Sequence, residues 1–192
     1  MIRTYGPKHG NPLPNAIQIN TTSGGADWEK ELSPFYLGPC YHTDGRKVLR
    51  FENLWQFSKI YSDQVDENGN PNKDWETWSS KGFSEFRGVR YPKGKGAKPL
   101  YTWWNGKKLN YIEARKTVYI PEYSKLVVKT AAFQKLKKLH EEGNDLALFD
   151  FDGYPFQDNG MTYTDAIHNT SRPLGHSIVI MALLENVDLT KL

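Results

Sequence analysis

Apolar residues repeat at helical spacing along several stretches of the chain. Between Phe51 and Ser58, apolar or small residues recur every three or four positions, which predicts a helix with one buried face. Gly82 is expected to interrupt a second helix, and Pro121 to kink a third or begin a new one. The last pattern is apolar almost all round and is therefore expected to be buried. Helices are thus predicted over 52–61, 75–86, 110–119, 131–142 and from about 174 to 186.

Strand patterns are short and few. Residues 35–37 and 47–51 flank a turn at 43–45, which predicts a hairpin or a strand that leads into the first helix. A second apolar strand is expected over 146–149, where it would deliver Asp150 and the nearby Asp152.

The length of 192 residues fits one domain and allows a sizeable core. Residues 1–32 show no clear pattern and are expected to be irregular, which leaves 33–192 as the folded domain. The chain is therefore predicted to be a single α+β domain, dominated by helices, with a small β-sheet or hairpin.

The cysteine content and the hydropathy suggest a compartment. The chain has one cysteine, Cys40, so no intramolecular disulfide can form, and no Cys/His pattern has the spacing of zinc ligands. No apolar run approaches the ~20 residues that span a bilayer, and residues 1–20 lack the apolar core of a secretory signal. A reducing, cytoplasmic location without a membrane partner is expected, and the oligomeric state is left open.

Positive charge is concentrated in one part of the chain. The net charge is only +3, but residues 87–116 contain nine basic residues against one acid, Glu113. Aromatic residues are interleaved with the basic ones, which favours contact with phosphates and flat bases, although a solvated surface loop has the same composition. The basic residues are Arg87, Arg90, Lys93, Lys95, Lys98, Lys107, Lys108, Arg115 and Lys116.

Three polar residues share one face of the first predicted helix. Glu52, Gln56 and Lys59 stand at i, i+4 and i+7, beside the apolar face, so that a carboxylate, an amide and an amine are aligned. Such a carboxylate can act as a general base or stabilise an oxocarbenium-like centre. The spacing alone is more typical of an ordinary surface Glu–Lys pair.

A second group of acids follows the predicted strand at 146–149. The sequence Asp150-Phe151-Asp152-Gly153 imitates the Asp-x-Asp-Gly motif of haloacid-dehalogenase phosphatases, in which a carboxylate nucleophile works with Mg²⁺. That motif is followed by a long doubly wound domain, whereas only 40 residues follow Asp152. The position of the motif therefore argues against a phosphatase.

The first helix and the hairpin before it resemble the signature of the NADAR (NAD- and ADP-ribose-associated) family. The similarity is carried by Ser33-Pro34-Phe35-Tyr36, by the turn at Asp44-Gly45 and by Phe51-Glu52-Asn53-Leu54-Trp55-Gln56-Phe57-Ser58-Lys59. Weaker similarity extends to Glu113-Ala114-Arg115, to 146–153 and to Leu174-Gly175-His176 with the apolar helix after it. The segment 86–100 is not part of the common family pattern, and Glu122-Tyr123 stands near the place of its Lys-Phe pair.

The resemblance implies an N-glycosidase that cleaves an ADP-ribosyl or ribosyl-phosphate conjugate, with DNA as a further partner if the base belongs to a nucleic acid. Glu52 would be the catalytic carboxylate, because positive charge develops on the sugar during cleavage. Asp150 or Asp152 would be a second polar group at the sugar, and no metal or cofactor is required. The substrate-binding residues would be Gln56, Lys59, Arg90, Trp103 or Trp104 as a stacking platform, Arg115 and His176, which could instead cap its helix.

Two other classes of function fit the same residues. The first is a non-catalytic module that binds ADP-ribose or nucleic acid through the basic segment and its aromatic residues. The second is a structural or partner-binding protein, in which the alignment of Glu52, Gln56 and Lys59 is a coincidence. Loss of Glu52 separates the glycosidase from both alternatives, because only the enzyme needs this carboxylate for turnover.

Overall fold

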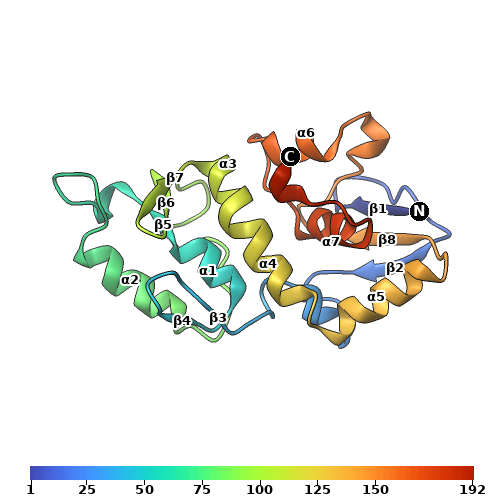
Figure 1. The fold of residues 1–192 in the computed structure, drawn as a ribbon, viewed down its shortest axis with the longest axis horizontal. Coiled ribbons are helices and arrows are strands. Elements are labelled where there is room, and N and C mark those ends of the chain that lie inside the picture. The colour runs from blue at the N-terminus through green and yellow to red at the C-terminus, as the bar shows by residue number, and fades with distance from the viewer. The chain divides into compact units, whose positions relative to one another are not determined.

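The computed structural model describes all residues from 1 to 192, and contacts within the chain divide it into two compact units (Figure 1). The parallel-sheet unit consists of Met1–Ser33 and Arg115–Leu192, and the central unit of Pro34–Ala114. Helices predominate and the sheets are small, so the predicted α+β class is confirmed. None of the helices combines the length and the apolar character that crossing a bilayer requires.

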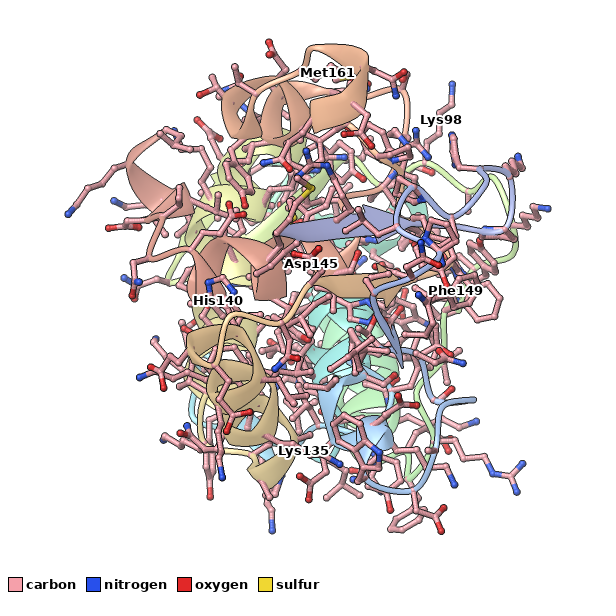
Figure 2. The ribbon with its side chains drawn as sticks, turned by 90° about the vertical axis from the view of Figure 1, so that its right-hand side faces the viewer. Lys98, Lys135, His140, Asp145, Phe149 and Met161 are labelled. Carbon is pink, nitrogen blue, oxygen red and sulfur yellow. The ribbon has the colours of Figure 1, made fainter.

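The parallel-sheet unit is built around the apolar strand β8 (Leu146–Phe149), as predicted from its sequence. This strand lies between β1 (Ile2–Tyr5) and β2 (Ile17–Asn20) and pairs with both in parallel (Figure 1). In Figure 2, the label Phe149 marks the last residue of β8 and Asp145 the residue immediately before the strand. Because parallel strands end at the same edge, the residues that follow all three strands lie together there.

The expectation that residues 1–32 are irregular was wrong for the two strands. β1 and β2 have four residues each, and although Ile17-Gln18-Ile19-Asn20 alternates apolar and polar residues, so short a run does not by itself distinguish a strand from a loop. They are strands because their backbones pair with β8, which lies more than 100 residues further along the chain. A pattern search within a short window cannot detect such long-range pairing.

Five helical segments complete the parallel-sheet unit, with three short 3₁₀ turns. Thr130 accepts a hydrogen bond from the Phe133 amide at 3.1 Å and so caps the helix that was predicted to begin there. The last helix is buried along nearly all of its length, as its apolar sequence predicted. The segments are the π-helix Arg115–Tyr119, α4 (Ile120–Val127), α5 (Ala131–Glu141), α6 (Tyr163–His168) and α7 (His176–Leu184), and the turns are Glu29–Leu32, Gln157–Asn159 and Leu189–Lys191.

A hairpin forms around the predicted turn at 43–45, with β3 (Cys40–Tyr41) and β4 (Lys47–Val48) as its strands. The prediction of a strand at 35–37 was wrong, because a turn covers residues 34–36 and the first strand begins only at Cys40. Helix α1 follows the hairpin, and a three-stranded antiparallel sheet with order β5-β6-β7 lies in the same unit. The remaining helices are α2, whose N-cap is the Asn72 side chain, and the short α3. The bounds are α1 Phe51–Phe57, β5 Lys59–Ile60, the 3₁₀ turn Ser62–Gln64, α2 Lys73–Phe83, β6 Tyr101–Trp104, β7 Lys107–Leu109 and α3 Tyr111–Ala114.

Helix α1 is shorter than the predicted span of 52–61, because its last residues belong to a strand. The Ser58 hydroxyl donates to the Leu54 carbonyl at 2.6 Å at the end of the helix. Lys59 and Ile60 then pair with β6 as strand β5. Backbone pairing with a distant strand thus overrides a helical pattern that continues in the side chains.

Gly82 does not interrupt helix α2, contrary to the prediction. A methyl group at this position would lie 2.1 Å from a ring carbon of Phe57, which is itself buried in the core of the central unit. The Phe57 ring also packs against Trp78 with a centroid separation of 4.5 Å, so it has little room to move. Gly82 is therefore required for the close approach of α1 and α2 rather than for a break in the helix.

We expect Gly82→Ala to lower the free energy of unfolding by about 1–2 kcal/mol. The cost of overpacking, ~1–3 kcal/mol, exceeds the gain of ~1 kcal/mol in helix propensity. Chemical denaturation measures the difference, and Thr77→Ala on the exposed side of the same helix is the matched control. An alanine at position 82 that stabilises the protein would contradict this packing.

Candidate functional site

The residues predicted to form a site fall into two groups, one in each unit, and each group is described by itself. The central unit holds the helix-face residues together with Arg90, Trp103 and Trp104. The parallel-sheet unit holds Arg115 and the polar residues that follow β8 or begin α7.

Glu52, Gln56 and Lys59 form a continuous hydrogen-bonded chain in the central unit. The Gln56 amide nitrogen donates to a Glu52 carboxylate oxygen at 2.9 Å, and the Lys59 ammonium donates to the Gln56 amide oxygen at 2.8 Å. Only 5% of Glu52 and 9% of Gln56 is exposed to solvent. The arrangement is therefore not the surface Glu–Lys pair that spacing alone suggests, but a carboxylate withdrawn from water.

Helix α1 positions Glu52 through backbone contacts at its first turn. The Phe51 amide donates to the Leu37 carbonyl at 2.8 Å, and the Glu52 amide donates to the Pro34 carbonyl at 2.9 Å. These carbonyls accept from two amides that have no partner within the helix. The segment 34–37, which precedes the hairpin, therefore caps the N-terminus of α1. The predicted segment Ser33-Pro34-Phe35-Tyr36 thus has a structural reason to accompany Glu52 in the sequence.

Asn53 is a site-supporting residue that the sequence analysis missed. It is fully buried, and its side chain donates to the carbonyls of Glu85 and Arg87 while it accepts from the Val89 amide at 2.8 Å. One side chain therefore connects residues 85–89, where the basic segment begins, to the helix that carries Glu52. An asparagine among the large apolar residues of a buried helix was the available signal, since a buried amide requires partners.

The environment of Lys59 changes its acidity. Burial lowers the pKa of its ammonium from 10.5 to about 8, and the negative charge of Glu52 opposes this shift. The ammonium also lies 4.9 Å from the centre of the Trp55 ring. A lysine of this kind is predominantly charged at neutral pH and still able to release its proton at moderately alkaline pH.

The three other predicted residues of the central unit differ in their accessibility. Trp104 is buried, with its ring edge-on to His42 at 5.2 Å, so its faces belong to the core. Trp103 is half-buried, its amide donates to the Ser58 carbonyl at 2.8 Å, and it therefore lies on the strand beside Lys59. Arg90 is half-buried, with its guanidinium 5.4 Å from the Tyr91 ring centre. Of the two tryptophans, Trp103 is the more accessible to solvent.

Asp150 lies at the common carboxyl edge of the parallel sheet and is almost completely enclosed. One carboxylate oxygen accepts from the Ser177 amide at 3.1 Å and lies 3.2 Å from His176 Nδ1. The other accepts from the Asp152 amide at 3.1 Å. Only 2% of Asp150 is exposed. Through its contacts with His176 and Ser177, the carboxylate connects the end of β8 to the first turn of α7.

His176 connects Asp150 to the end of β2. Its Nε2 lies 2.8 Å from the Thr21 carbonyl oxygen and 2.9 Å from the Thr21 hydroxyl. Nδ1 thus faces a carboxylate, and Nε2 faces the backbone and the hydroxyl of Thr21. The nearby Tyr123 hydroxyl donates to the Leu32 carbonyl, and burial, assisted by the charge of Asp150, raises the pKa of Tyr123 well above its usual range.

The geometry around Asp150 favours a structural role for its carboxylate. Protein donors engage both of its oxygens, and a methyl group added at Gly175 would lie 2.6 Å from one of them. Asp152 is half-buried and more accessible, which makes it the better candidate of the two for contact with a ligand. The chain contains no cluster of three or more His, Cys, Asp or Glu residues arranged to hold a metal ion.

Arg115 is buried and binds the loop between α6 and α7. Its guanidinium donates to the backbone carbonyls of Ile167, Asn169 and Arg172 at 2.7, 2.8 and 2.5 Å. Only 1% of the residue is exposed. These three bonds stabilise the loop that precedes the Asp150–His176 cluster, a function that the sequence analysis did not assign to this arginine.

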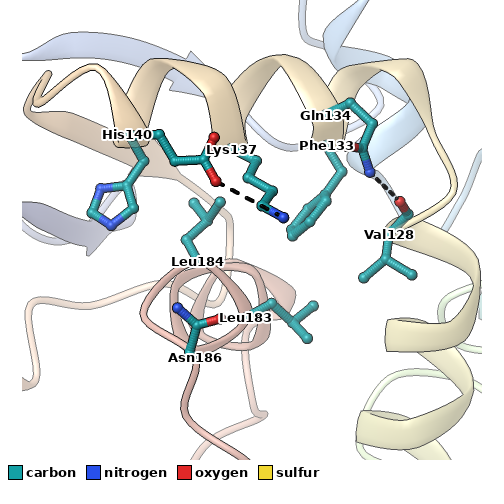
Figure 3. Close-up of a pocket in the computed structure, with 9 residues that line it drawn as sticks. Val128, Phe133, Gln134, Lys137, His140, Leu183, Leu184 and Asn186 are labelled. Carbon is teal, nitrogen blue, oxygen red and sulfur yellow. Dashed lines mark hydrogen bonds and ion pairs between the residues drawn. The ribbon is translucent and has the colours of Figure 1, made fainter.

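A separate groove of about 490 Å³ lies in the parallel-sheet unit between α5 and α7 (Figure 3). The Gln134 side chain donates to the Val128 carbonyl at 2.7 Å on one wall, and Lys137 lies 3.9 Å from Glu141 along the same helix. None of the predicted site residues lines it. Its lining residues are Val128, Phe133, Gln134, Lys137, His140, Glu141, Leu183, Leu184 and Asn186.

The chain belongs to DUF6939, a family of unknown function whose model matches residues 8–180. This range includes every residue predicted to form the site. The comparisons with curated proteins and with solved structures give no match. A function must therefore be proposed from the chemistry of the chain's own residues.

The depressed pKa of Lys59 predicts a particular dependence of stability on pH. Between pH 8 and 10.5 the unfolded chain retains a proton on this lysine that the folded protein has released, so stability rises with pH across this window. We expect the free energy of unfolding of wild type to increase relative to Lys59→Met from pH 8 to 10.5. Denaturation at several pH values tests this, and parallel curves for the two proteins would refute it.

We expect Asp150→Asn to lower the free energy of unfolding by about 3 kcal/mol, because it leaves the buried amides of Asp152 and Ser177 and the His176 ring with a poorer acceptor. The control is Asp158→Asn, which removes a partly exposed ion pair with Arg3 and should cost less than about 1 kcal/mol. Urea denaturation compares the two variants. Equal losses of unfolding free energy in the two variants would show that the buried cluster contributes no more stability than the partly exposed ion pair.

Proposed function

We propose that this member of the DUF6939 family is an N-glycosidase that hydrolyses the bond between a base or amine and the C1 carbon of a phosphorylated or ADP-ribosyl ribose. Glu52 is the proposed catalytic carboxylate, with Gln56 and Lys59 as its supporting partners. The observation that carries the proposal is the buried chain from Glu52 through Gln56 to Lys59. The similarity of this segment to the NADAR signature supports the same chemistry.

The burial of Glu52 has a cost for stability and a role in the proposed catalysis. A carboxylate removed from water is unfavourable unless it is compensated, and compensated groups of this kind are concentrated at functional sites. In the proposed reaction, the departing base leaves positive charge on the sugar, and the carboxylate stabilises that charge. It also accepts a proton from the water that attacks C1, while the proton required by the departing base comes from an acid or from solvent.

The Gln56 amide gives the carboxylate a fixed orientation. It occupies one oxygen, Oε1, with its nitrogen and presents its own oxygen to Lys59. The ammonium group of Lys59 contributes positive charge near the carboxylate, which favours its ionised form and attracts a phosphorylated substrate. Trp103, half-buried on the strand beside Lys59, is the proposed platform for the base.

The setting proposed for this reaction is the cytoplasm, on account of the single buried thiol of Cys40. No metal ion or cofactor is part of the scheme. The substrates that fit it are ADP-ribosyl conjugates, including those on nucleic-acid bases, and ribosyl phosphates that carry an amine.

We expect Glu52→Gln to reduce release of the sugar product by about 10²–10⁴-fold, the range typical of acid–base groups. The purified protein is incubated separately with ADP-ribosylated guanine and thymine in DNA, with amine-bearing ribosyl phosphates and with NAD⁺. Mass spectrometry follows the released ADP-ribose or ribose phosphate. Glu113→Gln, an exposed acid of the same unit, is the matched control and should retain wild-type turnover.

The outcomes separate the proposal from its alternative. Release by wild type that disappears in Glu52→Gln, with both proteins folded, identifies the glycosidase and its substrate class. Absence of release from every substrate, with wild type still binding ADP-ribose in a titration, would replace the enzyme with a non-catalytic binding module.

A further inference from the structure

The segment that connects α2 to β6 carries a surface that the proposed glycosidase chemistry does not use. From Phe86 to Leu100 this segment has five basic residues and no acid. The side chains of Arg87, Lys95 and Lys98 are exposed and make no hydrogen bond or ion pair. Lys98, labelled in Figure 2, extends away from the ribbon. Charge of one sign without internal partners favours an anionic ligand.

The same segment also carries exposed aromatic rings. Phe86 is 73% exposed and Tyr91 is 49% exposed. A phenylalanine exposed to this degree is unfavourable in water, and the largest apolar patches of a protein surface are frequently functional. A third exposed ring, that of Tyr36, is linked to Phe86 through Arg50, whose guanidinium lies 4.6 Å from the Phe86 ring centre and 5.8 Å from the Tyr36 ring centre.

These rings are held in place rather than left on a free loop. The Arg50 guanidinium donates to the Phe86 carbonyl at 3.0 Å, and Asn53 binds the backbone on both sides of this residue. Further along, the Lys93 ammonium pairs with Asp63 at 2.5 Å and lies over the rings of Tyr61 and Trp78. The base of the segment is thus anchored to the central unit before any ligand arrives, which reduces the entropy lost on binding.

We propose that this surface, defined by Phe86, Arg87, Tyr91, Lys95 and Lys98, binds single-stranded nucleic acid. Phosphates of the strand contact the arginine and the lysines, and unpaired bases stack on the two aromatic rings. Alternating cationic groups and exposed rings match the alternation of phosphate and base along a single strand. A duplex offers the same phosphates but keeps the faces of its bases inside the stack, so it can use only the charges.

Binding at this surface does not require turnover at Glu52, so it stands whether or not the protein is a glycosidase. If both proposals hold, the substrate base is carried on a single strand.

The test measures binding of fluorescently labelled 20-nucleotide single strands, one of DNA and one of RNA, and of a 20-base-pair DNA duplex by anisotropy at several salt concentrations. We expect either single strand to bind more tightly than the duplex. Phe86→Ala combined with Tyr91→Ala should weaken single-strand binding by at least about 5-fold, the equivalent of one lost stacking contact. Phe86→Leu keeps an apolar side chain without a ring and should lose affinity as Phe86→Ala does.

The charge component is tested separately. Lys95→Gln with Lys98→Gln should reduce the slope of log affinity against log salt by about 1.4, since each lost phosphate contact contributes ~0.7 for single strands. Lys137→Gln with Lys138→Gln, which removes two exposed lysines from α5, is the control of equal charge and should leave affinity unchanged. All these positions are exposed, and circular dichroism verifies that the variants fold.

Three results would overturn the proposal. The first is the absence of single-strand binding by wild type at low salt. The second is equal affinity for duplex and single strand, together with indifference to loss of the two rings, which would indicate a purely electrostatic surface. The third is an equal loss of affinity in the α5 control, which would indicate binding that depends on total charge rather than on this surface.

Discussion

The pairing of β8 with two strands from the beginning of the chain is the constraint on which the parallel-sheet unit depends. Leu146, Ala147 and Leu148 are fully buried, and their backbone groups find partners only because β1 and β2 lie on both sides. This pairing aligns the ends of the three strands. Asp150 and Thr21 consequently reach the same edge, where His176 bridges them at the start of α7. Without β8 in the centre of the sheet, Asp150, Thr21 and His176 would not lie together.

The central unit contains a different constraint, the buried carboxylate of Glu52. Helix α1 is enclosed along its length, and only 5% of Glu52 is left exposed to water. The Gln56 amide and the Lys59 ammonium compensate the charge of Glu52. Lys59 belongs to strand β5 rather than to the helix. The depressed pKa of Lys59 reflects the same burial. A protein retains such an arrangement at a cost in stability, which is the physical reason to connect it with function.

Asn53 couples the two chemical features of the central unit. Its neighbour in the sequence is Glu52, and its side chain holds the backbone from which the basic segment emerges. The proposed catalytic carboxylate and the proposed nucleic-acid surface are therefore anchored to the same helix. Arg50, immediately before that helix, fixes the exposed ring of Phe86.

Local patterns in the sequence determined much of the fold. Helices α5 and α7, strand β8 and the hairpin β3–β4 follow from apolar periodicity, capping residues and turn residues, which act over a few positions. The helix spacing also placed Gln56 beside Glu52. Of the basic segment, Arg87, Lys95 and Lys98 lie exposed outside helices and strands, whereas residues 101–104, 107–109 and 111–116 belong to strands or helices. These local features depend on contacts between residues a few positions apart, which can be predicted from the spacing of residues in the sequence.

Only the tertiary structure decided which polar groups are buried and what engages them. It assigned Arg115 to three loop carbonyls, enclosed Asp150 and Trp104, and converted residues 2–5 and 17–20 into strands. It also ended α1 before Lys59 and required Gly82 for close packing. Each of these outcomes depends on a partner from a distant part of the chain. Burial is a property of the assembled chain, and the hydrogen-bond partners of a buried group are therefore invisible in its local sequence.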